Sequence, residues 1–259
     1  EIAKKFFDNN WIDASLKVGK DSGAFSHPTV PDVHPYILLN FNGKPRDVMT
    51  LAHELGHGVH QFLARDQGYF MSDTPLTLAE TASVFGEMLV FNKLLNKTQS
   101  NEEKKFMIAQ KVEDMLNTVV RQIAFHNFET TFHNNRKSNE LTPDQICDIW
   151  MKTQKEALGD GIELDDSYRP LWSYVPHFIH APFYVYAYAF GDCLVNTLWQ
   201  VWQNDKGDFI DKYIKLLKAG GKFHHKEALK TFNLDATEPK FWDNGLKTIS
   251  VLIDKLENV

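Results

Sequence analysis

Two histidines and a glutamate at helical spacing form the most informative pattern in this sequence. His53, Glu54 and His57 lie in the run Leu51–His60, and the two histidines are four residues apart. On an α-helix this spacing puts both imidazoles on one face, about 6 Å apart along the axis. Such a pair can bind one tetrahedral Zn²⁺ ion. Glu54, about 100° round the helix from His53, would lie beside the metal as a general base toward water.

A zinc ion of this kind needs a third protein ligand and keeps its fourth position for water. His60 follows His53 by seven residues, but a helix rises about 10 Å over seven residues, which is too far to complete a tetrahedron. The metzincin pattern also fails, because His60 occupies the position of its helix-breaking glycine and Leu63 that of its third histidine.

Glu80, 23 residues after His57, is better placed to be the third ligand. Turn signals at residues 66–68 and 72–75 end the first helix, and a second helix is predicted over about 76–95 with Pro75 at its first turn. We predict that Glu80 binds the metal and that Glu87, two turns further on, accepts a hydrogen bond from a ligand imidazole. The alternative is a chance pattern in a chain with 11 histidines.

Composition limits the other classes of function. The 259 residues are 43% hydrophobic, enough for a sizeable core, and the net charge is −6 without a basic run. Nucleic acid and membrane surfaces are therefore excluded as expected partners, and no apolar run reaches transmembrane length. The only cysteines, Cys147 and Cys193, are 46 residues apart. This is not a disulfide framework, and it favours a reducing, cytoplasmic location. The sequence does not indicate an oligomeric state.

Apolar periodicity predicts a mainly α fold with a small edge β element. The predicted helices are 1–17, 48–64, 76–95, 101–136, 143–158, 180–204, 207–219 and 239–257. The best strand is 34–41, just before the metal helix. As an edge strand along a cleft it could bind an extended peptide through backbone hydrogen bonds. The alternative is a strand that pairs only within the protein.

Histidines and aromatic residues gather again in residues 172–191. If a helix begins near residue 181, His180, Tyr184 and Tyr188 share one face, whereas Tyr186 points elsewhere and His177 lies on the preceding turn. Imidazole and phenol groups could donate hydrogen bonds to the oxyanion that forms during peptide hydrolysis. A stripe of aromatic core residues with satisfied hydroxyl groups explains the spacing equally well.

Seven segments together carry a family resemblance: Gly23–Phe25, His34–Phe41, Thr50–His57, Leu78–Ser83, Pro176–Phe178, Phe183–Gly191 and Leu217–Gly221. With these segments the chain resembles the thimet oligopeptidase/oligoendopeptidase F family of zinc metallopeptidases, and most closely its oligoendopeptidase F branch. The resemblance implies a helical, zincin-type catalytic domain over residues 1–259, with a channel for short peptides. Members of the family are longer, so we expect this chain to be a fragment that lacks their N-terminal helical half.

The resemblance also implies roles for individual residues. His53, His57 and Glu80 would bind one Zn²⁺ ion, with Glu54 as general base. The transition-state donors would be His177 and one of three tyrosines, with Tyr188 favoured. The expected substrate-binding residues are Gly23, Ala24, His180, Tyr184 and Tyr186.

The predicted function is therefore zinc-dependent endopeptidase activity, in which a metal-activated water hydrolyses internal amide bonds of short peptides. A zinc carboxypeptidase is one alternative; it would need a cation for the terminal carboxylate, and Arg169 is the nearest in sequence to the second cluster. A zinc aminopeptidase is another, but its common pattern needs a glutamate where Leu76 stands. A peptide-binding fragment without turnover is the third.

Overall fold

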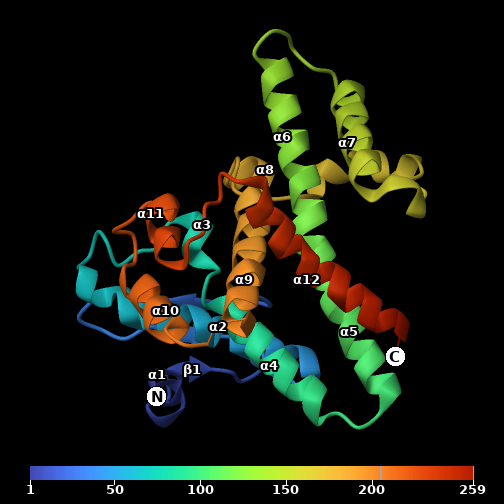
Figure 1. Cartoon of the computed structure of the whole chain (residues 1–259). Helices are drawn as coiled ribbons and strands as arrows, with labels where there is room; N and C mark the ends of the chain where they lie inside the picture. The colour runs from blue at the N-terminus through green and yellow to red at the C-terminus, as the bar shows by residue number, and fades with distance from the viewer. Residues whose placement is uncertain (205, 259) are drawn as a thin grey trace. The chain divides into compact units, whose positions relative to one another are not determined.

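The computed structural model describes residues 1–204 and 206–258 (Figure 1). Two compact units are formed, one by Glu1–Ile108 with Cys193–Val259 and the other by Ala109–Asp192. Helices dominate both, and the mainly α prediction is confirmed. None of the described helices combines the length and the apolar character of a membrane span. That residues 1–259 make up one catalytic domain stays a prediction.

The described β structure is one three-stranded sheet made of β1 (Ile12–Asp13), β2 (Phe25–His27) and β3 (Tyr36–Leu38). β3 lies in the middle, parallel to β1 and antiparallel to β2. The prediction that segment 34–41 is an edge strand is therefore wrong. Its neighbours are only two and three residues long, too short for an alternating pattern to show in the sequence. The edge strand on the side away from β1 is β2.

The N-terminal helix α1 (Ile2–Asp8) is shorter than the predicted 1–17. Asn10 has a φ of 59°, in the left-handed region, and turns the chain so that the Trp11 N–H donates to the Phe6 carbonyl over 2.9 Å. Phe6 then forms a buried cluster with Ile37 and Leu39 of the sheet segment. The sheet is thus anchored by a helix end that sequence periodicity did not reveal.

The metal helix α2 (Pro45–Ala64) begins three residues before the predicted start. Pro45 occupies the first turn, where the missing N–H costs nothing. Asp47 accepts hydrogen bonds from the N–H groups of Asn42 and Lys44, over 2.7 and 3.0 Å. These bonds pair backbone donors that a helix N-terminus leaves open. A short 3₁₀ turn, η1 (Arg65–Gln67), follows the helix.

The helix predicted over 76–95 is broken, so the prediction of one continuous helix is wrong. It consists of α3 (Leu76–Ala79) and α4 (Ser83–Lys97), with a bend at Glu80–Ala82. The Ser83 hydroxyl donates to the Glu80 carbonyl over 3.1 Å, a side-chain bond of the kind that competes with regular helical pairing. The Glu80 side chain therefore projects from a bend rather than from a helix face.

In the chain's middle section, one long helical segment runs through α5 (Asn101–Leu116), the π-helical turn η2 (Asn117–Arg121) and α6 (Gln122–Arg136). α7 (Pro143–Leu158) has the predicted bounds and a Thr142–Gln145 capping box. α6 and α7 lie side by side (Figure 1), and their shared core contains Phe125, Phe128 and Trp150. The 3₁₀ segments η3 (Gly159–Gly161) and η4 (Asp166–Tyr174) follow.

The helix predicted over 180–204 starts later, so its predicted start is wrong. α8 (His177–His180) is a separate turn and α9 spans Tyr186–Asn204. Phe183, between them, has a φ of 61°, a conformation that cannot continue a right-handed helix.

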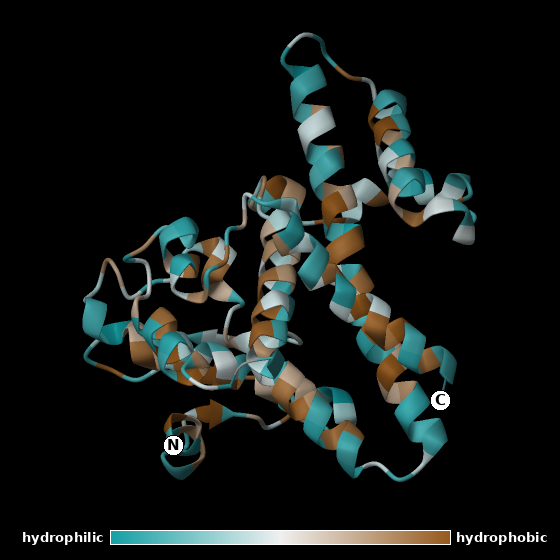
Figure 2. Cartoon of the chain, in the orientation of Figure 1, coloured by the Kyte–Doolittle hydropathy of each residue, from teal (hydrophilic) through white to brown (hydrophobic). Residues whose placement is uncertain are grey.

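The remaining helices are α10 (Phe209–Lys218), α11 (His225–Leu229), η5 (Lys230–Phe232) and α12 (Pro239–Asn258). α11 was not predicted, whereas α10 and α12 lie within two residues of their predicted bounds. Figure 2 shows hydrophobic and hydrophilic residues alternating along α12, as expected for a helix with one buried face.

Candidate metal centre

The side chains of His53, His57 and Glu80 converge on one point. The two Nε2 atoms are 3.0 Å apart, and Glu80 Oε2 lies 3.3 Å from His53 Nε2 and 3.4 Å from His57 Nε2. Among the described residues this is the group of histidine, cysteine and acidic side chains that could hold a metal ion. Helix α2 and the bend that follows α3 thus contribute to one site.

The donor set fits a tetrahedral metal. Bonds of about 2.0–2.1 Å in a tetrahedron place neighbouring ligand atoms about 3.3 Å apart. The three separations of 3.0, 3.3 and 3.4 Å lie close to that value. Two imidazole nitrogens and one carboxylate oxygen are also ligands that Zn²⁺ accepts. The residues present therefore fit such an ion.

Close packing of the backbone brings Glu80 to the histidines. A Cβ atom built on Gly56 of α2 would lie 2.3 Å from the Ala82 carbonyl oxygen and 2.5 Å from the Ser83 Cα. Only glycine leaves room for the bend at this distance. The single proton of the Ser83 hydroxyl is shared between the Glu80 carbonyl oxygen and Glu80 Oε2, which is the nearer at 2.6 Å, and this contact orients the carboxylate. The sequence analysis gave no role to Gly56. A glycine between two ligand histidines on a helix could have indicated that another segment packs closely there.

The bend is also held from α10. The Tyr213 hydroxyl donates to the Thr81 carbonyl over 2.8 Å, next to Glu80 in the chain. Tyr213 is buried against Phe85 and Phe209, and burial raises the pKa of its phenol. The hydroxyl thus stays protonated and remains a donor. No pattern within the sequence connects Tyr213 with a segment 132 positions earlier.

Glu87 of α4 makes a short contact with the other nitrogen of His53, 2.6 Å from Nδ1 to Oε1. A proton held there leaves Nε2 as the lone-pair atom on the side of Glu80 and His57. Burial lowers the pKa of His53, but the Glu87 hydrogen bond and the charges of Glu80, Glu87 and Glu54 outweigh it, so the pKa is raised.

Contacts within the cluster also change the pKa of the Glu80 carboxyl group. Burial raises its pKa, but the hydrogen bond and charge of His57, the charge of His53 and the Ser83 bond together lower it to about 2. Glu80 is therefore anionic over the pH range in which proteins work, and it supplies the negative charge that a cation needs.

Glu54 is buried beside the ligands, with 6% of its surface exposed. Burial raises the pKa of its carboxyl group, against the opposing charges of His53 and His57. Its Oε2 atom has no hydrogen-bond partner among the described residues. His60 is buried as well, and burial lowers its pKa to about 4. His60 is not part of the three-residue group.

The edge strand β2 is tied to the metal helix. Gln61, one turn beyond His57, accepts a hydrogen bond from the Ser26 hydroxyl over 2.8 Å and donates to the Ser26 carbonyl over 3.1 Å. Gly23 and Ala24, the predicted contacts of the substrate backbone, directly precede β2. Strand 25–27, rather than strand 36–38, therefore offers an open edge beside α2.

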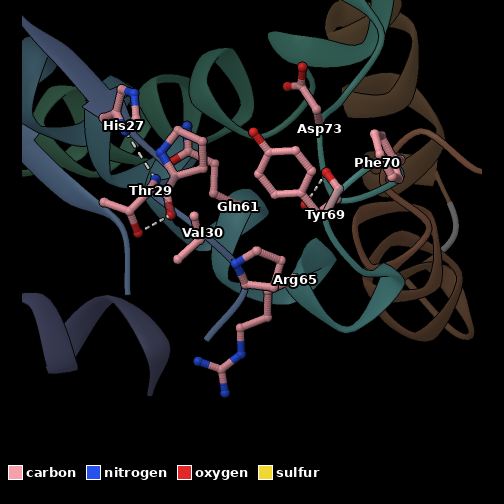
Figure 3. Close-up of a pocket in the computed structure, with 11 residues that line it drawn as sticks. His27, Thr29, Val30, Gln61, Arg65, Tyr69, Phe70 and Asp73 are labelled. Carbon is pink, nitrogen blue, oxygen red and sulfur yellow. Dashed lines mark hydrogen bonds between the residues drawn. The ribbon is translucent and has the colours of Figure 1, made fainter. Parts of the chain in front are cut away.

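A pocket of about 410 Å³ opens where β2 and α2 meet the loop after α2. Figure 3 shows Gln61 between Tyr69 on one side and Val30 on the other, while the Arg65 guanidinium extends away from the other side chains. Gly221 donates its N–H to the Met71 carbonyl over 2.8 Å. The Gly220–Gly221 loop therefore supports the segment 69–73, which lines one wall of the pocket.

In the second unit, His177 lies beside two of the predicted tyrosines. Its Nε2 is 3.2 Å from the Tyr188 hydroxyl, and its ring centroid is 5.6 Å from that of Tyr184. Tyr186 contacts His126 instead, and His180 is exposed on α8. The predicted shared face of His180, Tyr184 and Tyr188 is wrong, because the chain is not helical between α8 and α9.

Comparisons with known proteins find relatives along nearly the whole length of this chain. The model of peptidase family M3 matches residues 1–248. The chain is 31% identical to oligopeptidase PepF of Bacillus subtilis over 260 residues, which cover 100% of this chain and 38% of that protein. It is 32% identical to an oligoendopeptidase F homolog of Borreliella burgdorferi over 253 residues, 96% of this chain and 42% of that protein.

The fold agrees as well. A crystal structure from Chlamydophila abortus superposes with a TM-score of 0.85 at 30% identity, over 99% of this chain and 43% of that one. The chain thus spans about two fifths of the length of the relatives that it matches. Because the family model extends over nearly all of its residues, the chain belongs to peptidase family M3.

Proposed function

We propose that this chain carries the catalytic centre of a zinc-dependent endopeptidase that hydrolyses internal amide bonds of short peptides. The observation that carries the proposal is the convergence of His53, His57 and Glu80 at tetrahedral spacing, beside a buried carboxylate with a raised pKa. Membership of a peptidase family supports the reaction class, and the names of the relatives support peptides as substrates.

A zinc ion bound by these three residues would lower the pKa of a neighbouring water and polarise the substrate carbonyl. Glu54 takes a proton from that water as its oxygen adds to the carbonyl carbon. The carboxyl group then gives the proton to the nitrogen as the C–N bond breaks, and the amine leaves. A raised pKa suits both steps, because the carboxylate is a stronger base and the carboxylic acid holds its proton until transfer.

The other residues position the ligands and the substrate. Glu87 orients His53 through Nδ1, and Ser83 orients Glu80. A peptide paired with the open edge of β2 would run past Gly23 and Ala24, and one of its side chains would enter the pocket beside Gln61. His177 and Tyr188 would donate hydrogen bonds to the carbonyl oxygen as its negative charge develops.

The carboxypeptidase alternative loses Arg169, its candidate cation for the terminal carboxylate of a peptide. Arg169 Nη1 lies 2.8 Å from Asp148 Oδ1, so its guanidinium already pairs with a carboxylate of the chain. A side chain engaged in this way is poorly suited to bind the C-terminus of a peptide. This contact favours an endopeptidase, which needs no recognition of a chain end.

A fluorescence-quenched peptide with both ends blocked tests the proposal. We expect the zinc-loaded protein to cut it, and Glu54→Gln to keep one zinc per chain while losing at least about 10³-fold in kcat. Glu80→Gln is the matched control, since it should lose zinc as well as turnover. Turnover by zinc-loaded Glu54→Gln would refute the role of Glu54. Bound zinc and peptide without any cleavage would instead support a peptide-binding fragment.

A further inference from the structure

We propose that Glu129 of α6 is a positioning residue that holds the turn between α8 and α9, and through it the His177–Tyr188 pair. The inference rests on the proposed function for the catalytic role of that pair. All of these residues lie within the second unit, Ala109–Asp192.

Glu129 is a buried acid with a defined contact. Only 1% of its surface is exposed, and its Oε1 accepts a hydrogen bond from the Phe183 N–H over 2.9 Å. A carboxylate at such a position needs hydrogen-bond donors, because burying it without them is costly. The donor in this case is a backbone group 54 positions away, which indicates a role in holding that segment.

The segment has a backbone that needs support. Phe183 has a φ of 61°, which is strained for a residue with a large side chain. Strained conformations of this kind persist when surrounding contacts enforce them, and they often occur at functional sites. Backbone bonds from Ala181 N to the His177 carbonyl and from Tyr184 N to the Ala181 carbonyl form consecutive turns. Glu129 provides the acceptor for the amide between them.

The geometry of this turn determines the relative position of α8 and the start of α9. His177 opens α8 and Tyr188 lies in the first turn of α9, and their side chains meet at 3.2 Å between Nε2 and Oη. A change of the backbone at Phe183 would rotate α8 against α9 and separate these atoms. The pair therefore depends on a bond that neither residue makes.

Two ring contacts from the same helix support this role for α6. His133 lies 4.8 Å from Phe183 and His126 lies 5.7 Å from Tyr186, measured between ring centroids. His126, Glu129 and His133 are three, four and seven residues apart, so they share one face of α6. That face contacts the turn at Phe183 and the first residue of α9 at Tyr186, and Glu129 makes the contact that reaches the backbone.

Variants of Glu129 separate positioning from general stability. Glu129→Gln retains an oxygen that can accept the Phe183 N–H, whereas Glu129→Met has a similar size and no acceptor. Thr153→Val is the matched control, because it removes a buried hydroxyl bonded to the Trp150 carbonyl in the same unit. The variants are compared in the full chain, in the presence of zinc and with Tyr188→Phe as reference.

The first readout does not need activity. The ¹⁵N signals of the His177 ring report its hydrogen bond with Tyr188, and hydrogen–deuterium exchange reports the amides of Ala181, Phe183, Tyr184 and Val185. We expect Glu129→Met to shift the His177 signals toward those of Tyr188→Phe and to speed exchange about tenfold. Glu129→Gln and Thr153→Val should match the wild type. Wild-type His177 signals in Glu129→Met would overturn the proposal, as would equal shifts in Glu129→Gln.

The second readout is a double-mutant cycle in kcat. Glu129→Met should lower kcat about tenfold with little change in KM and none in bound zinc, and it should add no further loss in the Tyr188→Phe background. Independent, multiplying losses would contradict the proposal. If Glu129→Met does not fold, Glu129→Asp makes the same test, since its shorter carboxylate keeps the charge but cannot reach Phe183. Absence of turnover in the wild type would refute the proposed function, while the His177 signals would still decide the role of Glu129.

Discussion

Replacing Gly56 by alanine tests the packing that brings Glu80 to the histidines. The new Cβ would lie 2.3 Å from the Ala82 carbonyl oxygen, where ordinary Cβ contacts begin at 3.4 Å. The difference, 3.4 − 2.3 Å, requires the bend at Glu80–Ala82 to move by about 1.1 Å. Metal sites tolerate deviations of only about 0.2 Å in their bond lengths. The Glu80 carboxylate therefore cannot keep its place.

Two opposing effects determine the expected result for Gly56→Ala. In a helix interior, alanine is about 1 kcal/mol more favourable than glycine. Overpacking against backbone atoms costs about 1–3 kcal/mol, because a backbone cannot rotate away as a side chain can. We expect a net destabilisation of about 0–2 kcal/mol and a loss of zinc affinity of about 100-fold, which corresponds to about 2.7 kcal/mol.

Zinc affinity is measured by competition with a chelating dye, and stability by urea denaturation of the zinc-free protein. Gly58→Ala is the matched control on the same helix, because its Cβ would meet the Phe6 ring at 2.6 Å rather than the bend. That variant should lose stability but keep its affinity for zinc. Wild-type zinc affinity in Gly56→Ala would refute the argument from close packing.

Two further predictions concern buried residues near the site. Tyr213→Phe leaves the Thr81 carbonyl without its donor, so we expect a destabilisation of about 1–3 kcal/mol and zinc binding about tenfold weaker; an unchanged urea midpoint and affinity would contradict it. Because the pKa of His60 is about 4 in the folded protein against 6.5 normally, the unfolded chain binds the proton first as the pH falls. Stability of the zinc-free protein should therefore decrease from pH 6.5 to 4 by about 3 kcal/mol, from about 1.36 kcal/mol for each of 2.5 units. His60→Leu should lack this part of the decrease, and identical pH slopes for the two proteins in urea denaturation would contradict the prediction.

Local features of the sequence were sufficient for much of the fold. The helices over 143–158 and 239–257 could be predicted because apolar spacing and capping residues act within a few positions. The same local geometry shows that His53 and His57 must share a helix face. It also indicates that Glu54 lies beside them rather than between them.

Contacts between distant segments could not be predicted from local sequence patterns. The edge role of strand 34–41 was wrong because two very short strands pair with β3 on either side. The prediction of one continuous helix over 76–95 was wrong because Ser83 and Tyr213 hold a bend that helical periodicity does not reveal. Likewise, the start of α9 depends on Phe183, whose strained backbone is held by Glu129.

Side-chain types and their spacing on one helix were enough to predict which residues could bind a metal, because both are local properties. How Glu80 reaches the histidines follows only from the packing of separate elements, through a glycine contact and a tyrosine hydroxyl. A hydrogen bond or a close backbone approach between distant segments depends on how the whole chain folds. A helical repeat depends only on the next few residues.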